Sequence, residues 1–317
     1  MGYVKEMKDY FAGFIGQEKV KSQLALHLDG YKVNKFLSPI GLISSKGTGK
    51  SSLMLKIAEN LTGQNGKPKQ LLNLNCSSVK NLGTFVDQII HPYQNTEVTF
   101  AFDEIHLLPK EVISFLLSVI TPNRERKSSC FYSGIQYSFD FHQLSFLSAS
   151  TNPEKLPSPF LSRLERIDLD EYKDSELVDI LKQATPRIDY QNDIEKEIVS
   201  VCRSTPREVI KVSDRIIQWC DIKHNQTFNG RDWLELRKRA NINYLGINAT
   251  ELKHLRFLKQ HGELTLTSLA SKLRLDRHTV QANIETFLLE KSLIAIDVKR
   301  RLTTKGKEVL MKVEENA

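Results

Sequence analysis

The chain has 317 residues, of which 40% are hydrophobic and 26% charged, and its formal net charge is +7. This length predicts two or three domains with sizeable cores, and the composition excludes a disordered or low-complexity protein. No apolar run approaches the roughly 20 residues that a membrane-spanning helix needs. Residues 1–8 also lack the apolar region of a signal peptide. We therefore expect a cytoplasmic protein.

The cysteines show no signature of a metal or disulfide site. Cys76, Cys130, Cys202 and Cys220 are scattered along the chain without the close pairing of a zinc centre. We therefore expect free thiols in a reducing compartment and no metal held by cysteine.

The excess positive charge is concentrated near the C-terminus. From Tyr244 onward the chain has 13 lysines and arginines against 9 aspartates and glutamates, which is more than half of the total excess of +7. A basic module suits a polyanion such as nucleic acid, although a bias of this size is also common on solvated surfaces.

Residues 43–52, "ISSKGTGKSS", have the form of a phosphate-binding loop. An apolar run at 40–43 predicts a buried strand before the loop, and Leu53, Ile57 and Leu61 recur at the spacing of one helix face after it. Ser44 stands where the pattern has its first glycine, but this change removes no ligand. Lys50 is expected to reach the β- and γ-phosphates of ATP, and the Ser51 hydroxyl to bind Mg²⁺. The residues expected to bind the nucleotide are Lys46, Gly47, Thr48, Gly49, Lys50, Ser51 and Ser52.

A second element of the same site follows about 50 residues later. The segment from Val98 to His106, "VTFAFDEIH", predicts an apolar strand that ends in two adjacent carboxylates. Asp103 is expected to hold Mg²⁺ and Glu104 to polarise the attacking water. Either motif alone has many false positives, but both in this order predict a nucleotide site.

With these motifs placed, the chain resembles the RuvB family, the AAA+ ATPases that drive branch migration of Holliday junctions. The similarity covers nearly the whole chain and rests on "FIGQEKVKSQL" (14–24), "DEIHLL" (103–108), "LSASTNPEKLPSPFLSRL" (147–164) and "STPREV" (204–209). The resemblance implies an α/β fold, namely an AAA+ P-loop core with a parallel sheet, a small helical lid and a C-terminal winged helix. It also implies ATP and Mg²⁺ as cofactors and a homo-oligomeric ring, with a hexamer as the expected form.

The resemblance further implies roles for single residues. Phe14 and Ile15 would lie against adenine. Thr151 falls at the sensor 1 position, where its hydroxyl could position water or the γ-phosphate. Asn152 is the alternative, because an asparagine fills this role in many other AAA+ proteins. Arg163 matches the arginine finger, which would reach the ATP of the next subunit and stabilise charge on the transferred phosphoryl group.

Arg207 matches the family's sensor 2 and has local support. Thr205 and Glu208 stand three residues apart as a capping box, with Pro206 at the first helical position. This pattern predicts that Arg207 lies in the first turn of a lid helix, where it could lean toward the phosphates.

The residues from about 244 predict a winged helix, which is a helix-turn-helix variant. Asn248 starts a first helix that Gly262 ends, a short strand and a small helix over 267–273 follow, and Asp276 caps a third helix that runs through Leu289. Residues 293–304 alternate as a two-stranded wing.

The wing is the expected contact with DNA. Lys299 and Arg301 fall at the positions of two arginines in the family's wing, and Arg300 replaces the glycine between them. All three are expected to contact phosphates, which gives an affinity that falls with salt and carries no sequence information. Many winged helices bind protein instead, and this alternative stays open.

One region departs from the family pattern. In RuvB, a β-hairpin between the Asp-Glu segment and sensor 1 docks through an apolar tip on the partner protein RuvA, and the equivalent region here is residues 123–141. We expect its tip to consist of Arg124, Glu125, Arg126 and Lys127. Burying four charges on an apolar surface is costly. The hairpin is therefore predicted to bind a protein other than an ordinary RuvA, as in a divergent paralogue.

These observations predict three parts, namely an AAA+ ATPase core over residues 1–171, a helical lid over 172–243 and a winged-helix DNA-binding domain over 244–317. The expected function is a ring-forming ATP-dependent motor that translocates along or remodels branched or duplex DNA. The alternative is an ATP-switched DNA-binding or recruitment module without helicase activity, similar to a clamp loader or to a regulator from a mobile element or defence system.

Overall fold

The computed structural model describes residues 9–315, so the expectation about a signal peptide, which rests on residues 1–8, lies outside the described residues. The chain divides into two compact units, one ending at Tyr172 and the other starting at Lys173. A further boundary near residue 243 stays a prediction. Among the described helices, none is long and apolar enough to cross a membrane.

The first unit is built on a five-stranded sheet in which all neighbouring strands run parallel, in the order β2-β3-β6-β1-β7. Every residue of β1 and β6 is buried, as expected for central parallel strands with both faces covered. The predicted α/β fold is confirmed. The strands are β1 (Ile40–Ile43), β2 (Gln70–Asn75), β3 (Val98–Asp103), β6 (Leu144–Ser150) and β7 (Glu165–Asp168).

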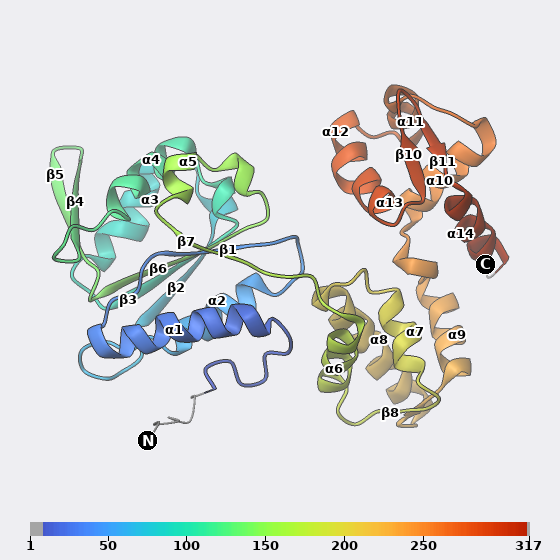
Figure 1. Ribbon diagram of the computed structural model, residues 1–317, viewed down its shortest axis with the longest axis horizontal. Coiled ribbons are helices and arrows are strands. Elements are labelled where there is room, and N and C mark those ends of the chain that lie inside the picture. The colour runs from blue at the N-terminus through green and yellow to red at the C-terminus, as the bar shows by residue number, and fades with distance from the viewer. Residues whose placement is uncertain (1–8, 316–317) are drawn as a thin grey trace, which may run out of the picture. The chain divides into compact units, whose positions relative to one another are not determined.

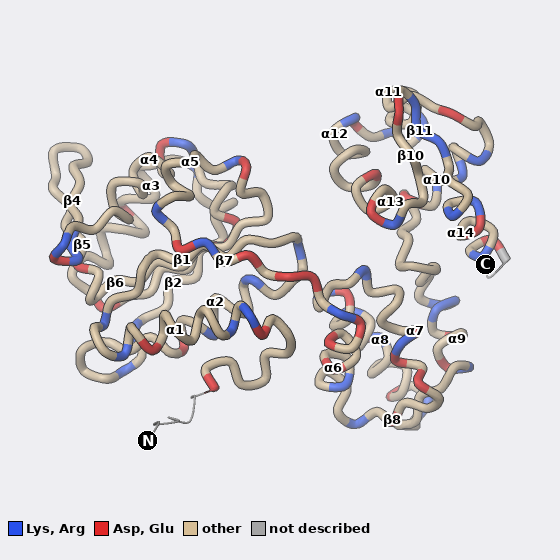
Figure 2. Tube along the Cα trace, in the orientation of Figure 1, with Lys and Arg blue, Asp and Glu red and all other residues tan. Residues whose placement is uncertain are grey.

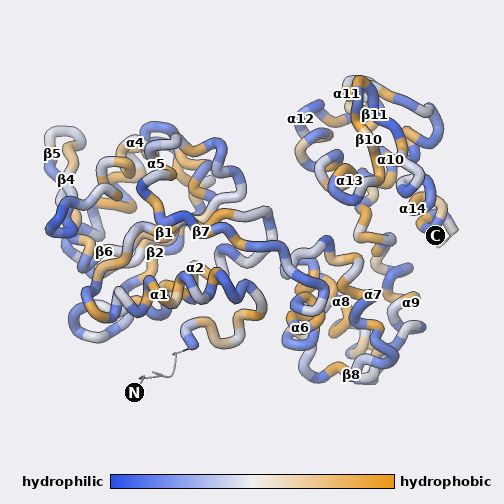
Figure 3. The backbone as a smooth tube through the Cα atoms, in the orientation of Figure 1, coloured by the Kyte–Doolittle hydropathy of each residue, from blue (hydrophilic) through white to orange (hydrophobic). Residues whose placement is uncertain are grey.

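Helices cover both faces of this sheet, and each face has its own apolar core (Figure 1). In one of these two cores, the rings of Phe100, Phe102 and Phe146 are stacked, with centroids 5.2–6.5 Å apart. Figure 3 shows the central strands as hydrophobic segments between more polar loops. One face packs against α1 (Glu18–Asn34) and α2 (Lys50–Glu59), and the other against α3 (Leu82–Phe85), a π-helix (Val86–Ile90), α4 (Lys110–Val119) and α5 (Ser158–Leu161).

The hairpin of β4 (Lys127–Tyr132) and β5 (Ile135–Asp140) differs from the expectation. Residues 124–127 lie at its base, because Lys127 pairs with Asp140 and the two strands then pair residue by residue as far as Tyr132 and Ile135. The tip is the turn at residues 133–134, flanked by Phe131 at 73% exposure and Ile135 at 50%. Figure 2 shows the charges at the base and an uncharged tip. The predicted charged tip is wrong, because residues 127–132 form the first strand of the hairpin and place the turn at residues 133–134.

The second unit begins with a helical bundle. Two short strands, β8 (Asp189–Tyr190) and β9 (Thr227–Phe228), pair in parallel beside it. Trp219 and Trp233 are both buried. The bundle helices are α6 (Asp174–Ala184), α7 (Ile194–Ser200), α8 (Pro206–Lys223) and α9 (Gly230–Ala240).

The winged helix follows with its own apolar core. Asn248 and Glu251 form a capping box, Gly262 ends that helix with a positive φ of 74°, and Asp276 caps the helix that starts at Arg277, as predicted. The elements are α10 (Ala249–His261), α11 (Leu266–Leu273), α12 (Arg277–Thr279), a π-helix (Val280–Glu285), α13 (Thr286–Glu290), β10 (Ile294–Ile296), β11 (Arg300–Leu302) and α14 (Thr304–Glu315).

Two features of this domain were not predicted. The expected short strand after Gly262 is a single bridge between Leu264 and Arg300. The helix α14 was missed, although Val309, Leu310 and Val313 recur at helical spacing and close the core from the C-terminal side.

Candidate nucleotide site and charged surfaces of the C-terminal unit

The phosphate-binding loop connects β1 to α2, which begins at Lys50. Gly47 and Gly49 have φ angles of 89° and 96°, in the region that side chains with a Cβ rarely adopt. Lys50 is buried, and its Nζ donates hydrogen bonds to the carbonyl oxygens of Ser44 and Ser45 at 2.9 and 2.7 Å. The loop therefore has the turn geometry that a phosphate cradle requires, with its lysine folded over the entrance.

Ser44, the departure from the glycine pattern, fits this loop without strain. It is not among the described residues with a positive φ, so a Cβ is tolerated there. Its hydroxyl hydrogen-bonds with the hydroxyl of Thr48, and its carbonyl accepts from Lys50. The serine thus bonds within the loop.

Ser51 and Asp103 meet at the carboxyl ends of the strands. The Ser51 Oγ donates to Asp103 Oδ2 at 2.9 Å, which joins the start of α2 to the end of β3. Both atoms are hard oxygen ligands, and two neighbouring ligands of an octahedral Mg²⁺ with bonds of about 2.0–2.1 Å lie about 2.9 Å apart. The pair therefore fits a magnesium site completed by phosphate oxygens and water. Among the described residues, no cluster of three or more His, Cys, Asp or Glu side chains could hold a metal alone.

Glu104 is held at the same edge by the end of β6. Its backbone is left-handed, with φ 54° and ψ 52°, and its Oε2 accepts hydrogen bonds from the Thr151 Oγ1 at 2.9 Å and the Thr151 amide at 3.1 Å. A strained residue that the surroundings hold in place is a feature of functional sites. Asn152, the alternative to Thr151, instead donates through Nδ2 to Glu154. Of the two sensor 1 candidates, Thr151 is the one bonded to Glu104.

His106 is a neighbour that the sequence reasoning missed. Its Nδ1 lies 2.9 Å from Ser150 Oγ and 3.4 Å from Glu104 Oε2, and its side chain is almost fully buried. Burial lowers the pKa of His106, and the nearby carboxylate of Glu104 opposes this only in part. His106 is therefore neutral at neutral pH. The signal was its position two residues after Glu104, where a 3-10 turn brings it back beside that carboxylate.

The N-terminal candidates lie beside the loop. A Cβ added to Gly49 would lie 3.4 Å from the Phe14 ring and 3.6 Å from the Tyr172 hydroxyl, so both aromatic residues border the loop. Ile15 is half-buried next to Phe14. Gln17 exchanges hydrogen bonds with the backbone of Asp170, which ties this segment to the chain that follows β7.

Arg163, the candidate arginine finger, and Arg207, the candidate sensor 2, are both exposed. Arg163 donates to Thr121 Oγ1 at 2.7 Å and to the Pro159 carbonyl at 2.6 Å, rather than to residues of the loop. Arg207 lies in the first turn of α8, as predicted, with Pro206 at its start. The predicted capping box is wrong, because the Thr205 hydroxyl donates back to the Cys202 carbonyl instead of accepting an amide of the helix.

The three wing cations are not equivalent. Lys299 and Arg301 are exposed, and Arg301 pairs with Asp297 at 3.2 Å. Arg300 is 8% exposed, and its Nε and Nη2 donate to the two carboxylate oxygens of Glu285 at 2.9 and 3.2 Å. Burial raises the pKa of Glu285, but its interactions with His254 and Arg300 outweigh burial and hold the pKa below its usual value. Arg300 is thus turned into the domain, and its predicted place among the phosphate contacts is not supported, because alternate residues of a strand face opposite sides.

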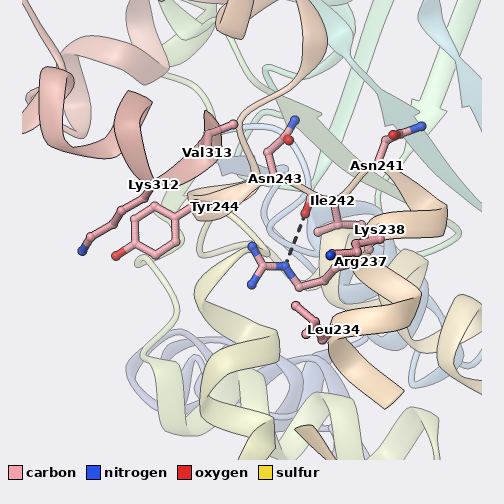
Figure 4. Close-up of a pocket in the computed structure, with 9 residues that line it drawn as sticks. All are labelled: Leu234, Arg237, Lys238, Asn241, Ile242, Asn243, Tyr244, Lys312 and Val313. Atoms are coloured by element: carbon pink, nitrogen blue, oxygen red, sulfur yellow. Dashed lines mark hydrogen bonds between the residues drawn. The ribbon is translucent and has the colours of Figure 1, made fainter. Parts of the chain in front are cut away.

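A separate small pocket of about 150 Å³ lies within the second unit, between the end of α9 and the end of α14 (Figure 4). Its polar lining includes Arg237, Lys238 and Lys312. Arg237 donates to the Ile242 carbonyl and pairs with Glu197. These cations lie at helix C-terminal ends, whose partial negative charge they offset, so the pocket is not assigned to a ligand.

The four cysteines form no disulfide. All four are free thiols, and three of them are buried. Burial raises the pKa of Cys76, Cys130, Cys202 and Cys220, which makes them poor nucleophiles and metal ligands.

Comparison with known proteins agrees with this geometry. The family model described as "ATPase family associated with various cellular activities (AAA)" matches residues 40–172, which contain the loop, the Asp103-Glu104 pair and Arg163. The model described as "RuvB C-terminal winged helix domain" matches residues 244–311. The AAA match identifies the chain as an ATP-binding, ATP-hydrolysing enzyme.

Relatives align along nearly the whole chain. A Holliday junction branch migration complex subunit RuvB from Ureaplasma parvum is 26% identical over 320 residues and covers 95% of each chain. The same subunit from Campylobacter jejuni is 25% identical and covers 93% of this chain and 88% of its own. The structure of the Thermotoga maritima RuvB Holliday junction branch migration motor superimposes with a TM-score of 0.77 at 25% identity, over 96% of this chain and 98% of that one. With an AAA match over the nucleotide site and a RuvB match over the winged helix, this chain belongs to the RuvB family of AAA+ ATPases.

Proposed function

We propose that the chain is an ATP-driven DNA motor of the RuvB type, which assembles into a ring and moves or remodels branched DNA such as Holliday junctions. The observation that carries the proposal is the bonding of Ser51 to Asp103 and of Glu104 to Thr151 at one edge of the sheet, in a chain that ends in a winged helix with exposed cations. Relatives described as branch migration subunits support the choice of DNA structure.

In this proposal, the loop holds the nucleotide, and residues at the ends of β3 and β6 take part in its hydrolysis. The amides of residues 46–52 and the Lys50 ammonium would bind the phosphates, and Ser51 and Asp103 would hold Mg²⁺, which would neutralise phosphate charge when bound. Glu104 orients and polarises the attacking water, while Thr151 keeps its carboxylate in place until the γ-phosphate arrives.

Residues beside the loop and at the start of α8 are proposed to make the remaining contacts with the nucleotide. Phe14 borders the loop, and Phe14 and its chain neighbour Ile15 are proposed to lie against adenine. Arg207 at the start of α8 is proposed to act as sensor 2. The division into a core over residues 1–171, a lid over 172–243 and a winged helix over 244–317 belongs to this proposal.

Arg163 is proposed to act on the ATP of the neighbouring subunit. It is exposed and bonds to Thr121 and the Pro159 carbonyl, so its guanidinium is presented on the surface of its own subunit. An arginine supplied in trans stabilises the charge of the transferred phosphoryl group and makes hydrolysis depend on assembly.

DNA is proposed to contact the wing through Lys299 and Arg301, with Arg300 acting as the buried anchor of β11. The hairpin is proposed to dock on a partner protein through Phe131 and Ile135. These exposed apolar side chains remove the reason for excluding a RuvA-like partner, since the four charges lie at the hairpin base.

The test is ATP hydrolysis by the full chain with and without a four-way DNA junction. Lys50→Ala and Arg163→Ala should each lose turnover, and mixing the two variants should restore part of it, because the mixed interfaces combine an intact loop with an intact finger. Arg166→Ala is the matched control, since Arg166 is an exposed neighbouring arginine that pairs with Asp168.

The same assay separates the alternative of an ATP-switched binding module. Junction-stimulated turnover with strand movement supports the motor. ATP-dependent junction binding without turnover or strand movement contradicts it and favours the switch. Lack of rescue in the mixture contradicts the trans finger.

A further inference from the structure

Arg203 ties the helical bundle to the winged helix. Its Nη1 donates to Glu251 Oε1 at 3.1 Å, its Nε donates to the Gly246 carbonyl at 2.9 Å, and its guanidinium lies 4.1 Å from the centre of the Phe287 ring. Nη2 bonds to the same carboxylate and carbonyl. All three partners belong to residues 244–317, whereas Arg203 belongs to the loop between α7 and α8.

The acceptor is built to need this arginine. Glu251 is fully buried, and its Oε2 also accepts the Asn248 amide at 2.8 Å in the capping box of α10. A buried carboxylate is costly unless it is paired and hydrogen-bonded, and Arg203 supplies the pairing charge from outside the domain. The first turn of the winged helix is therefore completed by the bundle.

The backbone on both sides is shaped for this contact. Arg203 and Ser204 both have positive φ, at 52° and 54°. Gly246 has φ 68°, and a Cβ there would lie 2.2 Å from the Val201 carbonyl oxygen, so only glycine permits this approach. Two consecutive left-handed residues without glycine are uncommon and persist where the surroundings impose them.

Arg203 lies close in the chain to Arg207, the candidate sensor 2 residue. It lies in the loop that leads into α8, four residues before Arg207, which lies in the first turn of that helix. Elsewhere between α9 and α14 a pocket of about 150 Å³ remains open (Figure 4). The hydrogen bonds of Arg203 therefore join the bundle to the winged helix close to the start of α8, where Arg207 lies.

We propose that Arg203 is a positioning residue that couples the start of α8, and so the nucleotide-sensing end of the bundle, to the DNA-binding winged helix. The inference rests on the proposed function, because it concerns how ATP turnover and DNA contact communicate. Arg203 touches neither ligand. Its loss should uncouple the two events while leaving each of them in place.

The experiment compares Arg203→Met and the double variant Arg203→Met with Glu251→Gln in the full chain. The double variant removes both charges, so that an unpaired buried carboxylate cannot unfold the domain. Arg237→Met is the matched control, because Arg237 also holds a carboxylate (Glu197), a carbonyl (Ile242) and an aromatic ring (Trp233), but all three lie in the bundle or at its end. Basal ATP turnover, duplex affinity and the stimulation of turnover by duplex DNA are measured for each.

Both Arg203 variants should keep basal turnover and DNA affinity and lose about 5-fold or more of the DNA stimulation, which is the usual lower size of a coupling between sites. Arg237→Met should keep the stimulation. Unchanged stimulation in the double variant would overturn the inference.

A second readout does not depend on the proposed function. Spin labels at exposed positions, introduced as Arg231→Cys in α9 and Asn283→Cys in the winged helix on a Cys130→Ser background, report the distance between the two parts by electron double resonance. The wild-type distribution should be narrow and that of the double variant broad. If wild-type turnover proves insensitive to DNA, the proposed motor fails. Distance distributions of equal width in the wild type and the double variant would overturn the coupling as well.

Discussion

At the nucleotide edge of the first unit, residues far apart in the chain are already bonded to one another, whereas the wing cations of the second unit stand separately. Ser51 bonds to Asp103, and Glu104 to Thr151, across 52 and 47 positions. Lys299 and Arg301 are exposed on a short hairpin, and the arginine between them is buried. ATP hydrolysis requires the reacting groups to be held in one fixed geometry. Contacts with DNA phosphates require only that a positively charged side chain can reach a phosphate. Substitutions should therefore act as a unit in the first region and independently in the second.

The largest expected effect is that of Glu104→Gln. Losing the carboxylate that polarises water should reduce turnover about 10²- to 10⁴-fold while ATP binding is retained. Steady-state hydrolysis and nucleotide titration of the full chain measure this. Glu59→Gln, on the exposed face of α2, is the control and should leave turnover unchanged.

The cooperativity of this site can be tested by adding Thr151→Val. Alone, Thr151→Val should slow turnover about 10-fold, because it removes the hydroxyl that holds Glu104. When it is added to Glu104→Gln, it should reduce turnover much less, since the effects of residues that act as a unit are not additive. Full additivity would contradict the comparison.

Arg300→Met should have the next largest effect, on stability rather than on DNA contact. It removes the arginine partner of the buried Glu285, and breaking a buried ion pair costs about 3–5 kcal/mol. Thermal unfolding of the full chain should show an early transition. Arg300→Met with Glu285→Gln should recover most of the loss, and no recovery would argue against the buried pair.

The exposed wing cations should show a smaller and additive effect. Lys299→Gln and Arg301→Gln should each reduce the slope of log affinity against log salt by about 1, and together by about 2. Fluorescence anisotropy with labelled duplex at several salt concentrations measures the slope. Lys196→Gln, exposed in the bundle and paired with Asp193, is the control. An unchanged slope would remove the wing from the DNA contact.

The smallest effect concerns a third kind of cation, Lys69, which is buried in the first unit and donates to the His142 carbonyl and Ser145 Oγ. Burial lowers the pKa of Lys69 from 10.5 to about 8. Between these values the unfolded chain binds more protons than the folded one, so stability should rise with pH.

Thermal unfolding at pH values from about 8 to about 9.5 should show a rise of the midpoint by about 2–4 °C. Lys69→Met should reduce this rise of the midpoint with pH. A midpoint that falls over this window would contradict the shifted pKa.

Much of the nucleotide site was predictable because its signal is local. A buried strand, two glycines, a lysine and a helix must follow one another in the chain, and the apolar run before Asp103 and Glu104 is equally local. The contact of His106 with Ser150, and the choice of Thr151 over Asn152 as the partner of Glu104, were not predictable, since each depends on how the end of β3 turns against β6.

The sequence by itself determined the strands and helices around the nucleotide site, the order of the motifs and the helix caps at Asn248, Gly262 and Asp276, because periodicity and capping act within a few residues. Only the tertiary structure decided that Phe131 and Ile135 flank the hairpin tip, that Arg300 faces inward beside Arg301, and that Arg203 completes the first turn of the winged helix. Strand register reverses which face a side chain occupies with a shift of one residue, and a buried charge finds its partner through the fold rather than through spacing along the chain.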